Sequence, residues 1–503
     1  MTMVLASMVM IMLCTATVGL AVGDIVDSHR SAANEEARAV AAAGLDEFFS
    51  RVVANPNVYF DTTQPTNYTT HPAYAPNWAA FDTQGRPIAC PDFNTTCYQL
   101  VVHYRSSPES AVVQSTARTY CRGDTTGSGC VYARSEQTLR RRQFFDYLYF
   151  SNREALDPLI TPSSPLGPGS SFEQTNCTGL FPRPSGCLDV AYQARQVGSD
   201  LVDGPVHTND SAVLVCGNPH FKDTVEATGY SGSSGTTAWT TPNTTGCTGA
   251  NSNPVFDKAP TVVSAISIPQ SRTSLGTAAA VAGTKWSYVG TVTITANGST
   301  LSVSCSGSSC PTTGSTLAYP DGRVIFVDGT AVVSGTVVGG LSIVSQCSTG
   351  TPGVGGCGDI QIPADLTVNS LAANSPDIVG LNALGSVVIT NYNGAADRTV
   401  DAAMLAVSHS VYVAGWQTGL FTSPVPTLHV TGALDGAWRG AYGGYNPDGN
   451  LASGYTKDFH FDRRLQRIQP PYFLQPVAAS WARVDEVEVP PCPNGASICT
   501  GVS

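Results

Sequence analysis

Four polar residues in one short segment have the side chains that bind divalent cations. Asp203, His207, Asn209 and Asp210 offer an imidazole, two carboxylates and an amide oxygen, all of which are common metal ligands. Asn and Asp in such a segment also fold back on their own backbone and cap a turn. We therefore expect a hydrogen-bonded turn and no metal centre, with Asp203, His207 and Asp210 as the candidate ligands if a metal binds here.

A second group alternates polar and aromatic side chains. Asp458, His460 and Asp462 are separated by Phe459 and Phe461. In a strand, successive side chains point to opposite faces, so this order puts the polar groups on one face and the rings on the other. The pattern suits a catalytic or metal-binding face, and equally a half-buried strand, which is the commoner use of such alternation.

The remaining motifs point away from catalysis. Oxygen-bearing side chains over residues 446–450 lie beside a glycine, but they lack the spacing of a calcium loop and predict a plain turn. The chain has no nucleophile elbow, no zinc-protease helix motif and no glycine-rich phosphate loop. We expect no catalytic residue and no cofactor. The 19 Tyr and 6 Trp residues could bind sugars if exposed, although core packing is their ordinary role.

The cysteines predict an oxidising compartment. Of the 15 cysteines, Cys14 lies in an apolar segment and the other 14 fall into close neighbours. Short loops of Gly, Ser, Thr, Pro or Asn between neighbours suit local disulfides, although spacing alone does not fix connectivity. The absence of CxxC spacing argues against zinc. The candidate pairs are Cys90 with Cys97, Cys121 with Cys130, Cys177 with Cys187, Cys216 with Cys247, Cys305 with Cys310, Cys347 with Cys357, and Cys492 with Cys499.

The N-terminal residues predict a long helix that would hold the rest of the chain. Residues 1–23 are uncharged and almost wholly apolar, and a helix of this length crosses about 30 Å of hydrocarbon. A cleaved signal peptide and a buried helix are the alternatives; signal peptides open with Lys or Arg, and none precedes Asp24. Residues 24–55 lack proline and predict a continuing amphipathic stalk helix. Its apolar face comprises Ala37, Ala41, Leu45, Phe48, Phe49 and Val52.

This N-terminal region resembles the type IV pilin-like superfamily, and within it the PilX-like minor pilins. The resemblance rests on the apolar span and on the run from Arg38 to Leu45, which is similar to the family's AAEAGL-like tail. It implies that Met1 is a possible mature N-terminus, left after removal of a leader. Leu5 stands where most pilins have a glutamate, an exchange that the resemblance associates with a tip or initiating position.

The rest of the chain predicts a mainly β protein. Only 13% of residues are charged, against about a quarter in average domains. From about residue 200, short β-rich runs alternate with Gly, Asn and Asp turns, without helix-length segments between them. A parallel β-solenoid and an antiparallel β-sandwich both fit, and continuous apolar runs such as Val324–Val327 favour the solenoid.

The predicted domains follow the chain in order. They are a transmembrane segment (1–23), a stalk helix (24–55), a small pilin-like α+β subdomain (56–157), a linker (158–199), a β-solenoid-like domain (200–435) and an irregular or β tail (436–503).

Our leading hypothesis is a structural, minor-pilin-like component of a type IV pilus or a related filament or secretion system. It would be a single-pass membrane or pilus-associated protein with its body outside the cell, acting in assembly initiation or adhesion. Expected partners are other pilin-like subunits through the helix, membrane lipid, and a surface glycan or a host or abiotic surface. The net charge of −11 argues against nucleic acid. A membrane-anchored adhesin or carbohydrate-binding protein, and a polysaccharide-active enzyme on a solenoid, are the alternatives.

Overall fold

The structure is a computed structural model in which the chain forms two compact units. Unit 1 joins residues 1–142 to 480–503, and unit 2 comprises residues 143–479. The backbone is described for residues 2–54, 73, 77–92, 95–106, 109–119, 130–157, 159–160, 201–210, 212–215, 218–229, 238–240, 253–268, 275–390, 396–416, 426–445, 451–476 and 481–489. The side chains of residues 2–27 and of a few strand ends lie outside this description.

The units divide the chain differently from the predicted domains. Unit 2 is inserted into unit 1, because the last described strand returns to the first sheet. The segment from Tyr149 to Leu156, which we assigned to the small subdomain, pairs within unit 2. Residues 436–479, which we assigned to a tail, also belong to unit 2. Of the predicted linker, residues 158–199, only Leu159 and Ile160 are described.

Unit 1 is built on one helix. α1 (Thr2–Ala54) is uninterrupted, in agreement with the predicted continuity of the apolar and amphipathic segments. It contains no proline, and ion pairs such as Arg38 with Glu35 link successive turns. Among the described residues, no helix is long and apolar enough to cross a membrane. The side chains of residues 1–23 lie outside the described ones, so the transmembrane segment stays a prediction.

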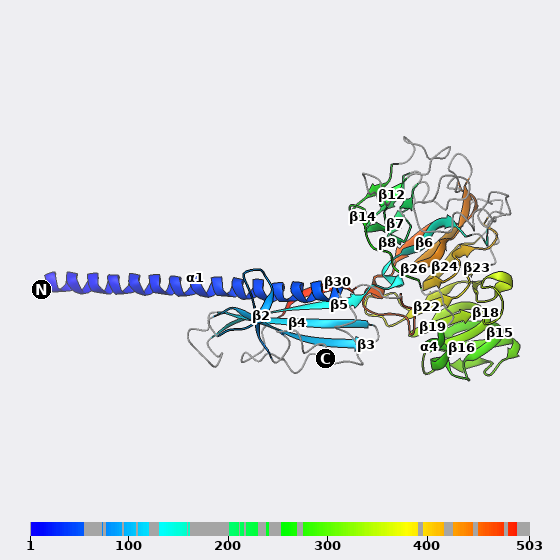
Figure 1. The fold of residues 1–503 in the computed structure, drawn as a ribbon, viewed down its shortest axis with the longest axis horizontal. Helices are drawn as coiled ribbons and strands as arrows, with labels where there is room; N and C mark the ends of the chain where they lie inside the picture. Colours follow the sequence, from blue (N-terminus) through cyan, green and yellow to red (C-terminus); the bar gives the residue numbers. More distant parts are fainter. Residues whose placement is uncertain are drawn as a thin grey trace. The chain divides into compact units, whose positions relative to one another are not determined.

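An antiparallel sheet packs against α1 (Figure 1). Its strand order is β2-β1-β3-β4-β5-β30, and α1 contacts β3, β4 and β5. Side chains from both layers form one buried cluster around Leu45, Phe48 and Tyr98. The strands are β1 (Ala79–Phe81), β2 (Pro87–Ala89), β3 (Cys97–Ser106), β4 (Glu109–Thr119), β5 (Val131–Arg141) and β30 (Trp481–Val489).

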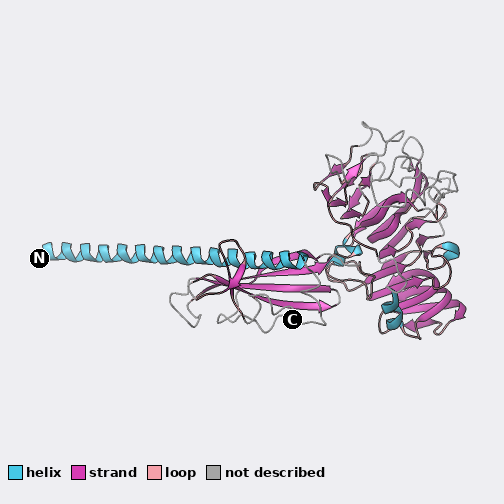
Figure 2. Ribbon diagram, viewed as in Figure 1, coloured by secondary structure: helices cyan, strands magenta, loops and turns pink. Residues whose placement is uncertain are grey.

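Unit 2 is almost entirely β, as the strands of Figure 2 show. Its main sheet has 20 strands. They are β6 (Tyr149–Leu156), β7 (Leu201–Asp203), β8 (Val206–Thr208), β10 (His220–Phe221), β11 (Val225–Ala227), β13 (Val255–Phe256), β14 (Thr261–Val262), β15 (Ser287–Gly298), β16 (Thr300–Ser309), β17 (Gly314–Ala318), β18 (Val324–Val337), β19 (Gly340–Gln346), β20 (Ile360–Ile362), β21 (Leu366–Val368), β22 (Ile378–Ala383), β23 (Val387–Ile389), β24 (Arg398–Ala406), β25 (Val411–Val413), β26 (Thr427–Arg439) and β29 (Thr456–Phe461).

Small elements complete unit 2. Two further pairs are β9 with β12, which is parallel, and β27 with β28, which is antiparallel. These strands and the helices are β9 (Val213–Leu214), β12 (Trp239–Thr240), β27 (Gly443–Tyr445), β28 (Leu451–Gly454), α4 (Gly276–Ala282), η2 (Phe144–Asp146), η5 (Val354–Gly356) and η6 (Arg463–Gln466).

Most pairings in the main sheet are parallel, and most of them join strands that are separated in the chain by one or more other strands, such as β19 with β22 and β20 with β23. Among its described strands, the antiparallel pairs are β15–β16 and β16–β17. Through the long strands β18 and β24, the pairings close a ring of five parallel strands, β18–β19–β22–β24–β21. Strands such as β22 are buried on both faces, which explains why most of their residues are apolar or small. The chain is thus mainly β with a long N-terminal helix.

The stack is assembled out of chain order. β6 pairs with β26 on one side and with β8 on the other, so that Tyr149 lies between Leu434 and Val206. β29 pairs with β7 in the same way. The chain therefore enters the stack in its middle, and its later strands return to the strands with which it entered. Figure 1 shows β6 beside β26 although their colours are far apart.

The segment after β29 covers one face of the sheet. Phe473 packs on Phe145 edge to face, with ring centroids 5.4 Å apart. The backbone N–H of Leu474 donates to Oδ1 of Asn382 in β22. A side chain at Gly380, also in β22, would collide with Pro470 and Phe473. This close approach buries the face of β22 on which Gly380 and Asn382 lie.

Candidate functional site

The face of α1 that rests on the sheet is the one predicted from spacing. Ala37, Ala41, Leu45, Phe48 and Val52 are all buried. Phe49 is half-buried, with the Arg483 guanidinium 4.4 Å from its ring centroid. Gly44 lets the helix approach β3 and β4 closely, because a Cβ there would lie 2.6 Å from the Tyr98 ring and 2.7 Å from Ser115 Oγ. The absence of a side chain at Gly44, together with the burial of the apolar face, determines how closely the helix packs on the sheet.

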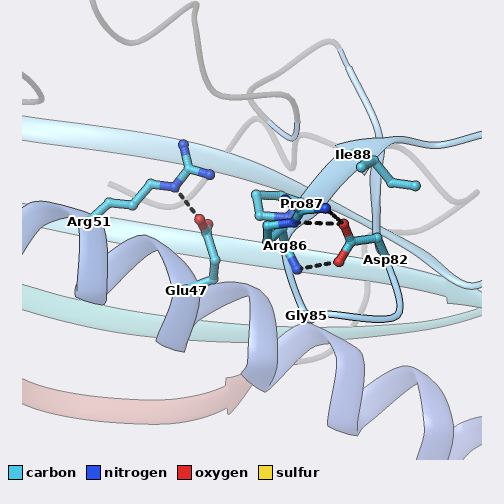
Figure 3. A pocket seen from close by; sticks show the side chains of 7 residues that line it. All are labelled: Glu47, Arg51, Asp82, Gly85, Arg86, Pro87 and Ile88. Carbon is cyan, nitrogen blue, oxygen red and sulfur yellow. Dashed lines mark hydrogen bonds and ion pairs between the residues drawn. The ribbon is translucent and has the colours of Figure 1, made fainter.

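A shallow hollow of about 530 Å³ lies beside this helix (Figure 3). Glu47 and Arg51 line it from α1, and they form an ion pair with each other. Asp82 and Arg86 line it from the β1–β2 turn and pair at 2.8 Å. Hydrogen bonds from Arg86, the backbone one foremost, hold the pKa of Asp82 below its ordinary value. Because these charges pair within their own elements, the hollow presents neither a net charge nor a nucleophile.

The three candidate metal ligands of unit 2 do not converge. His207 is buried, and both ring nitrogens have partners, Glu226 Oε2 at 3.2 Å and Asn209 Oδ1 at 3.0 Å. Asp210 is also buried and accepts the backbone N–H of Glu154. Asp203 instead lies beside Lys222, at 3.8 Å. Across the described residues, no group of three or more His, Cys, Asp or Glu is placed to hold a metal.

Parallel register brings two of the sequence groups together. Asp203 in β7 is the partner of His460 in β29, with 3.5 Å between Oδ2 and Nδ1. Asp458 accepts from both neighbouring imidazoles, His429 Nδ1 at 2.7 Å and His460 Nε2 at 2.8 Å. Partial burial raises the pKa of Asp458, but the two histidine hydrogen bonds outweigh it and hold that pKa below its ordinary value. The result is a half-exposed row of alternating acid and base across β26, β29 and β7.

Asp462, which the sequence pattern placed on the same face as Asp458 and His460, does not join this row. Asp462 caps η6 and accepts from the backbone and side chain of Arg464. Phe461 is buried and Phe459 packs edge to face on Tyr442. β29 therefore has the alternation predicted for residues 458–461, and the alternation ends at Asp462. The oxygen-rich turn at 446–450 lies outside the described residues.

A Ser–Asp–His group escaped the sequence analysis. Asp157 is fully buried and accepts from Ser410 Oγ at 3.0 Å, with His409 Nδ1 at 3.1 Å from its other oxygen. Burial would lower the pKa of His409, but Asp157 raises it above its ordinary value. Acyl transfer needs the histidine between the serine and the carboxylate, whereas here the carboxylate lies between them. With Asp157 about 250 positions away in the chain, no local signal could have revealed the group.

Three of the predicted neighbour pairs are disulfides. They are Cys90–Cys97, Cys305–Cys310 and Cys347–Cys357. Cys130 is also disulfide-bonded, and its predicted partner Cys121 lies outside the described residues. The other three predicted pairs stay predictions, because all six of their cysteines lie outside the described residues as well. These six are Cys177, Cys187, Cys216, Cys247, Cys492 and Cys499.

Comparison with known proteins assigns no family. No protein-family model and no curated protein sequence matches the chain. Among solved structures, the chain is similar to the crystal structure of the competence-associated pilin ComZ from Thermus thermophilus. That likeness has a TM-score of 0.24 at 10% identity, over 91% of this chain and 98% of that chain. A TM-score of this size does not establish a shared fold.

Proposed function

We propose that the chain is a structural, minor-pilin-like component of a type IV pilus or a related filament or secretion system. The observation that carries the proposal is α1, a single helix from Thr2 to Ala54. Its second half rests on an antiparallel sheet, and residues 1–23 of the chain are uncharged and almost wholly apolar. A helix of this kind can hold a folded head while its free half packs among other pilin-like helices or in lipid.

The body that such a helix would carry is a β-solenoid. Support comes from the parallel pairing of strands that are separated in the chain, such as β19 with β22, and from the five-strand ring closed through β18 and β24. In a solenoid each turn of the chain stacks on the next, so short strands pair with strands one turn away. The segments after β29 and around η2 cover part of its outer surface.

The chain is then a single-pass membrane or pilus-associated protein whose body lies outside the cell. There the body serves assembly initiation or surface adhesion. The local disulfides support this location, because disulfides persist in oxidising compartments. The role is structural and not catalytic. The Ser–Asp–His group supports this, because Asp157 lies between Ser410 and His409 and the histidine is not placed to activate the serine.

Two measurements on the native protein test the proposal. The first is the sequence and mass of the N-terminus, where we expect an N-methylated Met1. The second is co-sedimentation with sheared filaments. A charge placed in the apolar span, Val9→Asp, should remove the chain from the filament fraction, whereas the same charge on an exposed turn of unit 1, Gln84→Asp, should not. Cleavage after Gly23, or equal sedimentation of both variants, would refute the proposal.

A further inference from the structure

Three adjacent strands at one end of the stack present a regular grid of hydroxyl groups. β15 pairs with β18 in one unbroken parallel register from Ser287 to Gly298, and with β16 in antiparallel register. Four outward positions of each strand line up across the three. We call these positions the hydroxyl grid. From β16 across β15 to β18, its rows are Ser306–Thr291–Thr330, Ser304–Thr293–Val332, Ser302–Thr295–Ser334 and Thr300–Asn297–Thr336.

Burial separates the two faces of these strands. The inward residues Val292, Ile294 and Ala296 of β15 are buried, as are Ala331 and Val333 of β18. Between them the grid positions of β15 and β16 are exposed or half-exposed, and those of β18 are half-exposed. The hydroxyls therefore lie at the surface because the alternate side chains form the core.

The grid carries no charge. Every position holds Thr or Ser except Val332 and Asn297. In water, a single exposed hydroxyl exchanges one hydrogen bond for another at almost no net gain. A surface of this composition therefore holds a soluble ligand weakly. It becomes adhesive toward a partner that is itself a rigid lattice of hydrogen-bonding groups with a matching repeat, because many weak contacts then form together.

We propose that the hydroxyl grid is a docking surface for ice. Neighbouring strands lie about 4.8 Å apart, and alternate residues along a strand lie about 6.7 Å apart. These two repeats are close to the two oxygen repeats on the prism face of hexagonal ice. Within the protein, Thr330 Oγ1 of β18 donates to Gly356 O and Thr336 Oγ1 bonds Thr367 Oγ1, so the lattice contacts come chiefly from β15 and β16. Their Thr and Ser hydroxyls can occupy lattice positions while Thr methyl groups fill the spaces between them. Charged side chains would hold hydration shells that do not fit the lattice, and the grid has none. This surface does not involve α1, on which the proposed pilin-like role rests.

The test is enrichment of the purified full-length chain in slowly grown ice, compared with the remaining liquid. We expect the unchanged chain to be enriched. Thr293→Tyr raises a ring from the exposed middle of the grid and should lower enrichment about tenfold or more, as loss of a central contact does in interfaces. Thr293→Ser, which keeps the hydroxyl, should retain most of it. Circular dichroism verifies that each variant is folded.

A matched control lies at another strand of the stack. Thr261→Tyr makes the same exchange at an exposed residue of β14 and should leave enrichment unchanged. Exclusion of the unchanged chain from ice, or equal enrichment of Thr293→Tyr, would overturn the proposal. Retention on crystalline cellulose or chitin without enrichment in ice would overturn it in favour of a solid polysaccharide.

Discussion

Arg483, in the last described strand, donates a hydrogen bond to Asp46 in the N-terminal helix at 2.5 Å. The two residues are 437 positions apart in the chain, yet both belong to unit 1. The same guanidinium lies over the ring of Phe49. Unit 1 is therefore completed only when almost the whole chain has been made, because β30 is the edge strand beside β5.

We predict that Arg483 contributes more through Phe49 than through Asp46. Asp46 keeps 63% of its side chain exposed, so the ion pair should couple by only about 0.5 kcal/mol. Arg483→Ala should therefore lower the free energy of unfolding of unit 1 more than Asp46→Ala does, because it also removes the cation–π contact, worth about 0.5–1 kcal/mol. Urea unfolding of the two single variants and the double variant gives both single losses in the free energy of unfolding and the coupling energy between Asp46 and Arg483. Equal losses in the two single variants would contradict this account.

The close packing of α1 on β3 and β4 depends on the absence of a side chain at Gly44. Gly44→Val forces atoms into the space of the Tyr98 ring and Ser115 Oγ, and overpacking of this kind costs about 1–3 kcal/mol. We expect that loss in the urea unfolding of unit 1, with faster amide exchange over residues 37–52. Ala39→Val, at an exposed position of the same helix, introduces the same branched residue and should change stability little. A similar loss in both variants would assign the effect to helix propensity.

Two neighbouring arginines should differ sharply in their contribution to unit 2. Arg464 is buried, and its Nη1 donates to the backbone oxygens of Ser370 and Asp377 while its other nitrogens bond Asp462. The single ammonium group of lysine cannot make all of the hydrogen bonds of the planar guanidinium fork. Arg464→Lys should therefore lower the free energy of unfolding of unit 2 by about 2–4 kcal/mol. Arg463 has 61% of its side chain exposed, and Arg463→Lys should cost less than about 0.5 kcal/mol. Equal shifts in the urea midpoint would show that the fork is not needed.

The stability of unit 2 should fall as pH rises because of Asp435. This residue is fully buried between Leu405 of β24 and Phe150 of β6 in the strand register. Neither carboxyl oxygen has a hydrogen-bond partner among the described residues. Burial raises the pKa of Asp435 well above its ordinary value, so folding favours the protonated form of this acid.

The sign of the effect follows from the two pKa values. In the unfolded chain Asp435 ionises near pH 3.9, whereas in the folded chain it ionises only at higher pH. The full stability is thus present below about pH 3.9 and is lost progressively as pH rises toward the folded pKa. Asp435→Asn should remove this loss between pH 4 and pH 8, whereas Asp321→Asn at an exposed site should not. Parallel pH profiles of the unchanged chain and Asp435→Asn would exclude the mechanism.

Much of unit 1 and of the disulfide pattern could be predicted because the information is local. The spacing of Ala37, Ala41 and Leu45 predicts one buried helical face, and those residues are buried. Cys347 and Cys357 are ten residues apart, and the short loop between them keeps the two thiols close enough to pair. The long-range pairings are different, since any apolar strand offers the same backbone groups to a neighbour.

What the amino-acid sequence by itself determined is the uninterrupted N-terminal helix, the mainly β composition and the local disulfide pairs. Each depends on residues a few positions apart, through helical periodicity, β propensity or short loop closure. Only the tertiary structure decided that β30 joins the first sheet, that β6 lies beside β26, and that Asp203 meets His460. These contacts join residues hundreds of positions apart, and their register is selected by the packing of the whole stack.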